Sequence, residues 1–368
     1  MQSVAITALN IAPVPALNGA AAVRYDGRRV PTMLPSDVIV PAPRLSVVIV
    51  NWNSREDLRA CLASLAAQTL RELETIVVDN GSTDGSADMT AIEFPSARIV
   101  RLSANLGFAE GCNRGIAVAG APWIAMLNND TVADSAWAAA LADAAAAAPA
   151  RCGMLQSLML FRDRPGIVNS TGLELTRGGA GRDRWEETPR PPADDRAPQE
   201  IFCPTAGAAA YRRDMLDQIR LDDDGWFDRR HFMYFEDLDL GWRARLAGWT
   251  ALYVPASIVF HTWHGSVGRH GASWLEVIAS TNRTRTLFKN ASARFILGAT
   301  PELAGDVVMV TRHGGLKALG GLIAAVRDSL RQRADVTRMI RADRHTVERA
   351  GRSVTLNPAG TGVVLSQS

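Results

Sequence analysis

The sequence predicts an α/β protein in which helices cover a mixed, mostly parallel sheet. Short apolar runs rich in β-branched residues alternate with helix-like segments from residue 44 to about residue 155. Such alternation needs the right-handed crossovers that connect parallel strands. Polar residues directly follow several of these runs, at the strand ends where open α/β sheets bind ligands. The architecture is therefore typical of nucleotide-binding proteins.

Four strands and three helices account for this first part of the chain. The strands are the apolar runs at 45–50, 73–78, 98–102 and 123–127. The first helix carries an apolar stripe at helical spacing, made of Leu58, Cys61, Leu62 and Leu65. A second helix runs to about residue 119, and an Ala-rich third helix covers 135–148. Further along, the sequence predicts a helix over 238–246 and a strand over 257–260.

Composition and charge exclude several classes of protein. Of the 368 residues, 47% are hydrophobic and 21% charged, which is enough apolar material for a large core. The formal net charge of +2 argues against nucleic-acid binding by bulk charge. No apolar run reaches the roughly 18 residues that a transmembrane helix needs. The four cysteines are scattered, which favours a reducing compartment and hence the cytoplasm.

Two common nucleotide-binding motifs are missing where they would be expected. A dinucleotide-binding protein needs a G-x-G-x-x-G segment after the first strand, whereas this chain has Asn51-Trp-Asn-Ser54 there. A G-x-x-x-x-G-K-[ST] phosphate-binding loop is also absent. Simple cofactor binding of either kind is therefore not expected.

Five segments of the chain resemble, in order, the motifs of family 2 glycosyltransferases with a GT-A fold. The similarity is greatest to the bacterial rhamnosyltransferase-like branch and covers about residues 44–265. The segments are Ser46-Val-Val-Ile-Val-Asn-Trp-Asn53, Val77-Val-Asp-Asn-Gly-Ser-Thr-Asp84, Asn105-Leu-Gly-Phe108 with Asn113, Leu127-Asn-Asn-Asp-Thr131 and Phe235-Glu-Asp-Leu-Asp-Leu-Gly-Trp-Arg243.

The resemblance implies a nucleotide-sugar site at the ends of the first strands. Asp79 looks like the acid that contacts the base or ribose, because a carboxylate accepts hydrogen bonds from an imide N–H or a hydroxyl. Asn53 is expected to line the same pocket. Asn105 and Gly107 match the family's middle motif, where they either contact the nucleotide or only shape its loop. Asp79 as a mere turn residue is the alternative.

A divalent metal, Mg²⁺ or Mn²⁺, is implied as counter-ion of the donor diphosphate. Asn128-Asn129-Asp130 matches the family's D-x-D motif but has Asn at its first position. Asp130 is then its only carboxylate ligand, and Asn128 and Asn129 are assigned to the nucleotide sugar. Family members often have a metal-ligating histidine where this chain has His261, with His264 as second choice. N-capping by Asp130 and an ordinary polar role for His261 are the alternatives.

The resemblance assigns the catalytic base to Asp237, with Glu236 positioning the base or the acceptor. The two carboxylates begin a predicted helix, whose N-terminus favours their ionised forms. The implied reaction is a single displacement that inverts the sugar carbon. A capping role alone is the alternative for Asp237.

The acceptor side is less defined. Trp226 and Tyr234 precede the carboxylates and either stack on a sugar or pack in the core. Asp239 and Arg243 lie on the same helix as the carboxylates; Arg243 contacts phosphate or acceptor, or forms an ordinary salt bridge. Residues 158–200 are interpreted as a loop-rich insertion near the acceptor opening, either a lid or a solvated loop.

The C-terminal part is interpreted as a basic amphipathic helical region. Residues 312–352 contain ten Lys/Arg and four Asp/Glu. A helical apolar stripe comprises Leu316, Leu319, Leu322, Ile323, Val326 and Leu330. Such a helix lies on an anionic membrane surface or packs on the catalytic domain. The former would place the protein peripherally at the inner face of the plasma membrane.

The predicted organisation has four parts. An N-terminal extension (1–43) precedes a glycosyltransferase domain (44–297), whose nucleotide half is about 44–130 and acceptor half about 131–297. The helical region (298–352) and a tail (353–368) follow.

The implied function is an inverting, metal-dependent hexosyltransferase of bacterial surface-polysaccharide or cell-wall synthesis. Its donor would be dTDP-rhamnose or a UDP-sugar, and its acceptor a glycan or a polyprenyl-diphosphate-linked sugar. The alternative is a catalytically inactive relative that binds a sugar nucleotide or a membrane. Asn128 favours that alternative, whereas Asp130, Glu236 and Asp237 argue against it. The pattern does not predict the oligomeric state.

Overall fold

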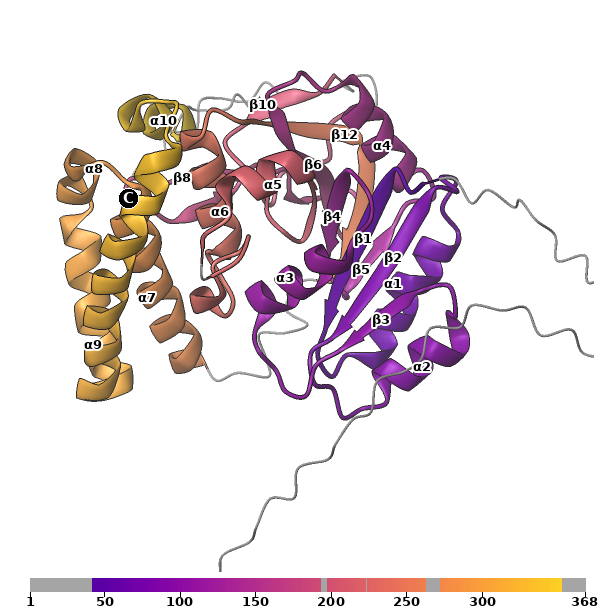
Figure 1. Cartoon of the computed structure of the whole chain (residues 1–368), viewed down its shortest axis with the longest axis horizontal. Coiled ribbons are helices and arrows are strands. Elements are labelled where there is room, and N and C mark those ends of the chain that lie inside the picture. Colours follow the sequence, from indigo (N-terminus) through magenta and orange to yellow (C-terminus); the bar gives the residue numbers. More distant parts are fainter. Residues whose placement is uncertain (1–41, 193–196, 223, 263–271, 353–368) are drawn as a thin grey trace, which may run out of the picture. The chain divides into compact units, whose positions relative to one another are not determined.

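A mixed sheet forms the centre of the protein in a computed structural model (Figure 1). The structure describes residues 42–192, 197–222, 224–262 and 272–352. Most of the predicted N-terminal extension, the tail and His264 lie outside these residues. The main strand order is β10-β12-β6-β11-β4-β1-β2-β3, with β5 beside β12 and β7 beside β6.

The first four strands are parallel, as the alternating pattern predicts. They are β1 (Leu45–Asn51), β2 (Leu73–Asp79), β3 (Arg98–Arg101) and β4 (Trp123–Leu127). Between and after them come α1 (Arg55–Ala66), α2 (Ser86–Glu93), α3 (Phe108–Val118) and α4 (Trp137–Ala147). The register pairs Asn51 with Asp79, so the polar residues after β1 and β2 begin at the same edge of the sheet.

Alternate residues of these strands enter two separate cores. Val48 of β1 belongs to a cluster that includes α3 residues, whereas Val47 belongs to a cluster with α1 and α4 residues. This is the period-two alternation of a strand covered on both faces. The predicted apolar stripe of α1 is buried in the second cluster.

The second half of the sheet adds antiparallel pairings. β11 (Ala208–Arg212) runs antiparallel to β4 and to β6 (Cys152–Phe161), and β6 is parallel to β12 (Thr250–His261). β5 (Thr131–Ala133) and β10 (Gln199–Ile201) pair antiparallel with β12. β7 (Val168–Ser170) pairs with β6, and β8 (Leu173–Leu175) forms a hairpin with β9 (Gly181–Asp183).

Helices dominate the rest of the chain. They are α5 (Arg213–Ile219), the short η1 (Arg229–His231), α6 (Glu236–Leu246), α7 (Ala272–Asn290), α8 (Ala293–Gly298), α9 (Thr300–Met339) and α10 (Arg344–Gly351). α9 consists of two helical arms that meet at Gly315, where φ is 64°, and both arms lie beside α7: Asp306 of the first pairs with Arg283, and Arg333 of the second donates to the Phe288 carbonyl (Figure 1). Among the described residues, none of the helices combines the length and the hydropathy needed to cross a membrane. The predicted C-terminal helical region is thus confirmed.

Candidate active site

Asp79 provides a buried carboxylate at the end of β2. Its side chain is 5% exposed, and Oδ1 has no hydrogen-bond partner among the described residues. A buried polar atom without a partner costs about 1–3 kcal/mol. A ligand that donates a hydrogen bond would remove this cost.

Asparagine side chains hold the loops around Asp79. Asn53 Oδ1 accepts a hydrogen bond from the Thr83 backbone N–H at 2.7 Å. Asn80 Nδ2 donates to Asn105 Oδ1 at 3.0 Å and to the Gly107 carbonyl at 3.1 Å. The side-chain bonds of Asn53 and Asn105 therefore shape the loops at this end of the sheet.

Gly107 brings this loop against the segment that precedes α6. It has φ of 88°, and a Cβ placed on it would lie 2.6 Å from the Phe232 ring and carbonyl. Only glycine allows this approach without a rearrangement. Asn113 adds a second link, because its Oδ1 accepts from the backbone N–H groups of Trp226 and Phe227. The middle motif thus connects the nucleotide half to the segment carrying the paired carboxylates.

Asp130 and His261 come together although they lie far apart in the sequence. β5 pairs with β12 so that His261 is opposite Thr131, and Asp130 Oδ1 lies 3.2 Å from His261 Nε2. The pair lacks hydrogen-bond alignment, and Oδ1 is buried without a partner among the described residues. His261 Nδ1 donates to Asn169 Oδ1 at 2.8 Å, which leaves the Nε2 lone pair directed elsewhere in the neutral ring.

This donor set matches a divalent cation. A carboxylate oxygen and an imidazole nitrogen converge, and the histidine is oriented by an amide on its other nitrogen, as is usual for metal ligands. Asn129 lies nearby, since its Nδ2 donates to Asn51 Oδ1 at 2.7 Å. Asn128 begins the turn, with its backbone N–H donating to the Gly207 carbonyl at 2.9 Å.

Glu236 and Asp237 open α6, as predicted. Asp237 Oδ2 accepts from the Ala206 backbone N–H at 3.1 Å, and Oδ1 accepts from that of Leu238 at 2.7 Å. Burial nevertheless raises the pKa of the Asp237 carboxyl. Burial and the neighbouring Asp237 raise the pKa of Glu236 well above its usual value, and Glu236 Oε2 lacks a partner among the described residues. Two poorly solvated carboxyls therefore stand side by side, which is typical of acid–base sites.

A two-residue bridge joins the Asp237 carboxylate to the Asn128–Asp130 turn. Ala206 donates its N–H to Asp237, and the next carbonyl, that of Gly207, accepts from Asn128. The candidate base and the candidate metal ligands are thus linked through the two-residue turn 206–207, which precedes β11.

Comparisons with known proteins show the family of the chain. The model of the family described as "Glycosyl transferase family 2" matches residues 46–220. The chain is 35% identical over 253 residues to the N-acetylglucosaminyl-diphospho-decaprenol L-rhamnosyltransferase of Mycobacterium tuberculosis, which covers 63% of this chain and 80% of that protein. The chain belongs to glycosyltransferase family 2.

Two further comparisons concern part of the sequence and the fold. The uncharacterized glycosyltransferase YibD of Escherichia coli K12 is 38% identical over 90 residues, covering 24% of this chain and 26% of that one. The crystal structure of GalNAc-T7 with UDP, GalNAc and Mn²⁺ superposes with a TM-score of 0.55 at 15% identity, covering 79% of this chain and 55% of that chain. This similarity confirms the predicted GT-A fold.

The segment before α6 has an unusual backbone. Phe232, Tyr234 and Phe235 all have positive φ values, of 62°, 67° and 70°. Such conformations cost about 1–3 kcal/mol each in non-glycine residues and persist only where the surroundings enforce them. Here the side chain of Asn282 in α7 enforces these conformations, because its Nδ2 donates to the carbonyls of His231, Met233 and Tyr234 at 2.7–3.0 Å.

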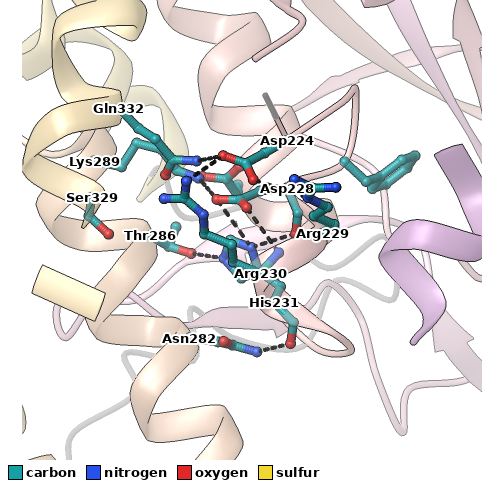
Figure 2. Close-up of polar contacts among 12 residues, drawn as sticks. Asp224, Asp228, Arg229, Arg230, His231, Asn282, Thr286, Lys289, Ser329 and Gln332 are labelled. Atoms are coloured by element: carbon teal, nitrogen blue, oxygen red, sulfur yellow. Dashed lines mark hydrogen bonds and ion pairs between the residues drawn. The ribbon is translucent and has the colours of Figure 1, made fainter. Parts of the chain in front are cut away.

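A buried polar network supports the same segment from the C-terminal helices. In Figure 2, Asp224, Asp228 and His231 face Thr286 and Lys289 of α7 and Gln332 of α9. His231 Nε2 lies 3.1 Å from Thr286 Oγ1, and Gln332 Nε2 donates to Asp224 Oδ2 at 2.9 Å. α7 and α9 are therefore part of the structure that positions the paired carboxyls of Glu236 and Asp237.

Asp239 and Arg243 are completely buried in this network, so their prediction as acceptor contacts was wrong. Arg243 Nε donates to Asp239 Oδ2 at 3.0 Å, and Lys289 Nζ lies 3.0 Å from Asp239 Oδ1. For Arg243, the structure agrees with the alternative expectation of an ordinary salt bridge. Oxygen and nitrogen atoms of Asp228, His231 and Asp239 lie within 4.8 Å of one another, as in a metal cluster. Lys289 Nζ, 2.5 Å from Asp228 Oδ2, already supplies the positive charge there.

The aromatic candidates occupy different surroundings. Trp226 Nε1 donates to Asp217 of α5 at 3.1 Å, and the Arg220 guanidinium lies over the indole ring. Trp226 thus packs on α5. Tyr234 is 37% exposed and lies two residues before Glu236, so it stays a candidate for acceptor contact.

Residues 158–200 are more structured than a solvated loop. The described part holds β7 to β10, and Asn169, Ser170 and Arg184 in it are buried. Asn169 orients His261, a role that sequence reasoning missed because nothing in the local pattern marks it.

Proposed function

We propose that this family 2 glycosyltransferase transfers L-rhamnose, with inversion, from dTDP-rhamnose to an N-acetylglucosaminyl diphosphate linked to a polyprenol. The Mycobacterium tuberculosis relative, 35% identical over 80% of its length, is an N-acetylglucosaminyl-diphospho-decaprenol L-rhamnosyltransferase, which supports this acceptor and this sugar. The observation that carries the proposal is the shared position of Asp130, His261 and Asp237 around the 206–207 segment.

Asp237 is the general base in this proposal. Its ionised form would take the proton of the attacking acceptor hydroxyl, and its raised pKa makes it a stronger base than an exposed aspartate. The backbone N–H groups of Ala206 and Leu238 hold the carboxylate in one orientation. Glu236 stands next to it with Oε2 available for a hydroxyl donor. Base assistance of this kind contributes roughly 10²–10⁴-fold.

Asp79 would bind the nucleotide through the unpartnered Oδ1, and the asparagine-held loops would keep its pocket in shape. Asp130 and His261 would hold Mg²⁺ or Mn²⁺; His261 favours Mn²⁺, because imidazole is a better ligand for it. Such an ion, when bound, neutralises the negative charge of the donor diphosphate. Attack from the Asp237 side, opposite the leaving diphosphate, gives inversion.

The acceptor would carry a lipid, and α9 presents a surface suited to a membrane. Leu316, Ile323 and Leu330 are 81%, 64% and 52% exposed and follow one another at seven-residue intervals. Arg312, Lys317, Arg327 and Arg331 of the same helix are also exposed. We therefore propose peripheral binding to the anionic inner face of the plasma membrane.

The test is a transfer assay with purified full-length protein, Mn²⁺ and a short-chain polyprenyl-diphosphate GlcNAc acceptor. Donors are dTDP-rhamnose, UDP-GlcNAc and GDP-mannose, and NMR of the product gives the anomeric configuration. Rhamnose transfer with inversion from dTDP-rhamnose alone supports the proposal. Transfer from another donor, retention of configuration or no transfer at all contradicts it.

A further inference from the structure

A small pocket lies at the end of α6 that is remote from Asp237. It has a volume of about 180 Å³ and lies between β8, β10, the last turn of α6 and the end of α10. Arg245 of its wall follows Asp237 by eight residues, which is about 12 Å along the helix axis. The wall includes Glu174, Arg184, Glu200, Phe202, Arg245 and Gly351. The residues assigned above to donor, metal and base do not line it.

Arg184 brings a buried positive charge to this pocket. The residue is 2% exposed, and its guanidinium donates to two neutral oxygens, Thr171 Oγ1 at 3.0 Å and Gln199 Oε1 at 2.7 Å. Its Nε is buried and has no hydrogen-bond partner among the described residues. Because a guanidinium has five N–H groups, Arg184 keeps donors that these two bonds do not use.

The surroundings compensate the charge of Arg184 only in part. The guanidinium lies over the Trp185 ring, 3.6 Å from its centroid, and 5.5 Å from the centroid of the Tyr253 ring. Cation–π contacts return only part of the free energy that burying an ion costs. Burial accordingly lowers the pKa of Arg184 to about 10, so the side chain remains charged at neutral pH. A bound anion would offset the remaining cost.

The carboxylates of the pocket pair with other arginines. Glu174 Oε2 lies 2.7 Å from Arg182 Nη2, and Glu200 Oε1 lies 2.9 Å from Arg245 Nη1. With Arg184, these side chains have a net charge of +1. The charge balance therefore favours an anionic ligand over a cationic one.

The size of the pocket restricts this ligand to a small ion. Pockets that enclose drug-sized ligands have volumes of roughly 300–1,000 Å³, so a sugar nucleotide would not fit here. Phe202 and Gly351 close one side tightly, because a Cβ placed on Gly351 would lie 2.8 Å from Phe202 Cδ2. Among small anions, phosphate matches the hydrogen-bonding geometry of arginine well.

We propose that this pocket binds a small phosphate-type oxyanion through Arg184, with Arg245 as the second cation. The site is separate from the one proposed for the donor diphosphate, and the inference does not rest on the proposed function. A purely structural role of Arg184, stacked on Trp185, predicts no anion binding here.

Calorimetric titration of the full-length protein with inorganic phosphate tests the proposal, in metal-free buffer of constant ionic strength. We expect saturable binding at one site. Glycerol 3-phosphate is titrated in parallel, since a phosphate monoester presents the same oxygens. Binding of phosphate alone assigns the free ion, and binding of both compounds extends the site to monoesters. Binding of neither overturns the proposal.

Three variants locate the site. Arg184→Gln should lose at least tenfold in phosphate affinity, because it removes charge-assisted hydrogen bonds. Glu200→Gln removes a negative charge from the wall and should raise the affinity by roughly two- to fivefold. Ala350→Phe fills the pocket from α10 without changing its charges and should abolish binding. The matched control is Glu93→Gln, because Glu93 pairs with Arg59 of α1 at 2.7 Å and should not affect phosphate binding.

The last two pocket variants decide the outcome even where Arg184→Gln does not fold. Wild-type affinity in folded Ala350→Phe, or an affinity of Glu200→Gln that is unchanged or lower, overturns the proposal. Loss of binding in Ala350→Phe together with tighter binding in Glu200→Gln supports it. The proposed function stands in every case, since its transfer assay does not depend on this pocket.

Discussion

At the scale of single residues, the site combines carboxyls that the fold holds in poorly solvated positions. Asp79, Asp130 and Glu236 each have a buried oxygen without a hydrogen-bond partner among the described residues. Native proteins rarely leave such atoms unpaired, and exceptions usually mark functional sites. The positions proposed for activity at these residues therefore lower the stability of the fold.

The pH dependence of transfer should reveal Asp237. Because burial raises its pKa, and because a base acts only when ionised, kcat/KM should fall with decreasing pH at a pH above the usual aspartate range of about 4. A pH–rate profile of the wild-type protein measures this decrease in kcat/KM. A profile that stays flat until the protein unfolds would contradict the assignment.

Glu236→Gln should stabilise the protein and reduce its activity. At neutral pH, a carboxyl whose pKa is higher folded than unfolded lowers the free energy of unfolding, so its neutral isostere removes that penalty. We expect a gain of roughly 1–2 kcal/mol, with a higher Tm in calorimetry. Glu187→Gln serves as the control, because the exposed Glu187 carboxylate has a lowered pKa and pairs with Arg164. A lower Tm for Glu236→Gln would show that its charge is stabilised in the fold.

At the scale of elements, the central feature is the segment 232–235, held by α7 in a strained backbone conformation. Asn282 Nδ2 donates to the carbonyls of Met233 and Tyr234 in this segment and to that of His231, which precedes it. Without these hydrogen bonds, the segment would relax and the start of α6, with Asp237, would shift.

Asn282→Ala should therefore reduce kcat by about 10–100-fold, since small misplacements of a catalytic group have effects of this size. Donor affinity, measured by calorimetric titration with dTDP-rhamnose and Mn²⁺, should change less than twofold. Thr281→Ala is the matched control, because the Thr281 hydroxyl donates to the Val277 carbonyl of its own helix. Equal activity of the Asn282→Ala variant and wild type would refute the positioning role.

The positions of candidate residues could be predicted from the sequence where local pattern and spatial position coincide. Asp79, Asp130 and His261 follow or end strands, so sheet topology alone brings them to one region. Asp239 and Arg243 lie on the same helix as Asp237, but they pair with each other in the interior, and Asp239 also pairs with Lys289, which lies 50 residues further along the chain. β7 to β10 have three residues each, too few for a periodic signal, so the contact of Asn169 with His261 was not predictable.

At the scale of the whole molecule, the C-terminal helices have two faces. Leu322, Ala325 and Val336 of α9 are buried, whereas Leu316, Ile323 and Leu330 are exposed. The two alternatives for this region, packing on the catalytic domain and binding a membrane, therefore concern different faces of one helix. Only the packing is observed.

Substituting Leu316, Ile323 and Leu330 together with Ser should weaken binding to vesicles of phosphatidylglycerol and phosphatidylethanolamine at least tenfold. Burying such side chains contributes about 1.5–3 kcal/mol each, so three of them suffice. Sedimentation with vesicles measures the change, and turnover with a water-soluble acceptor should be unaffected. The control is Ile92→Ser, an equally exposed apolar residue on α2. Unchanged vesicle binding of the triple variant would exclude α9 as the contact.

Donor binding and turnover, measured together in Asp130→Asn and Asp237→Asn, test the assignment of metal ligand and base most directly. We expect Asp130→Asn to lose at least tenfold of its Mn²⁺-dependent affinity for dTDP-rhamnose. Asp237→Asn should bind the donor as wild type does but transfer the sugar roughly 10²–10⁴-fold more slowly. The opposite pattern, with Mn²⁺-dependent binding intact in Asp130→Asn or turnover retained in Asp237→Asn, would contradict the division of labour between these two carboxylates.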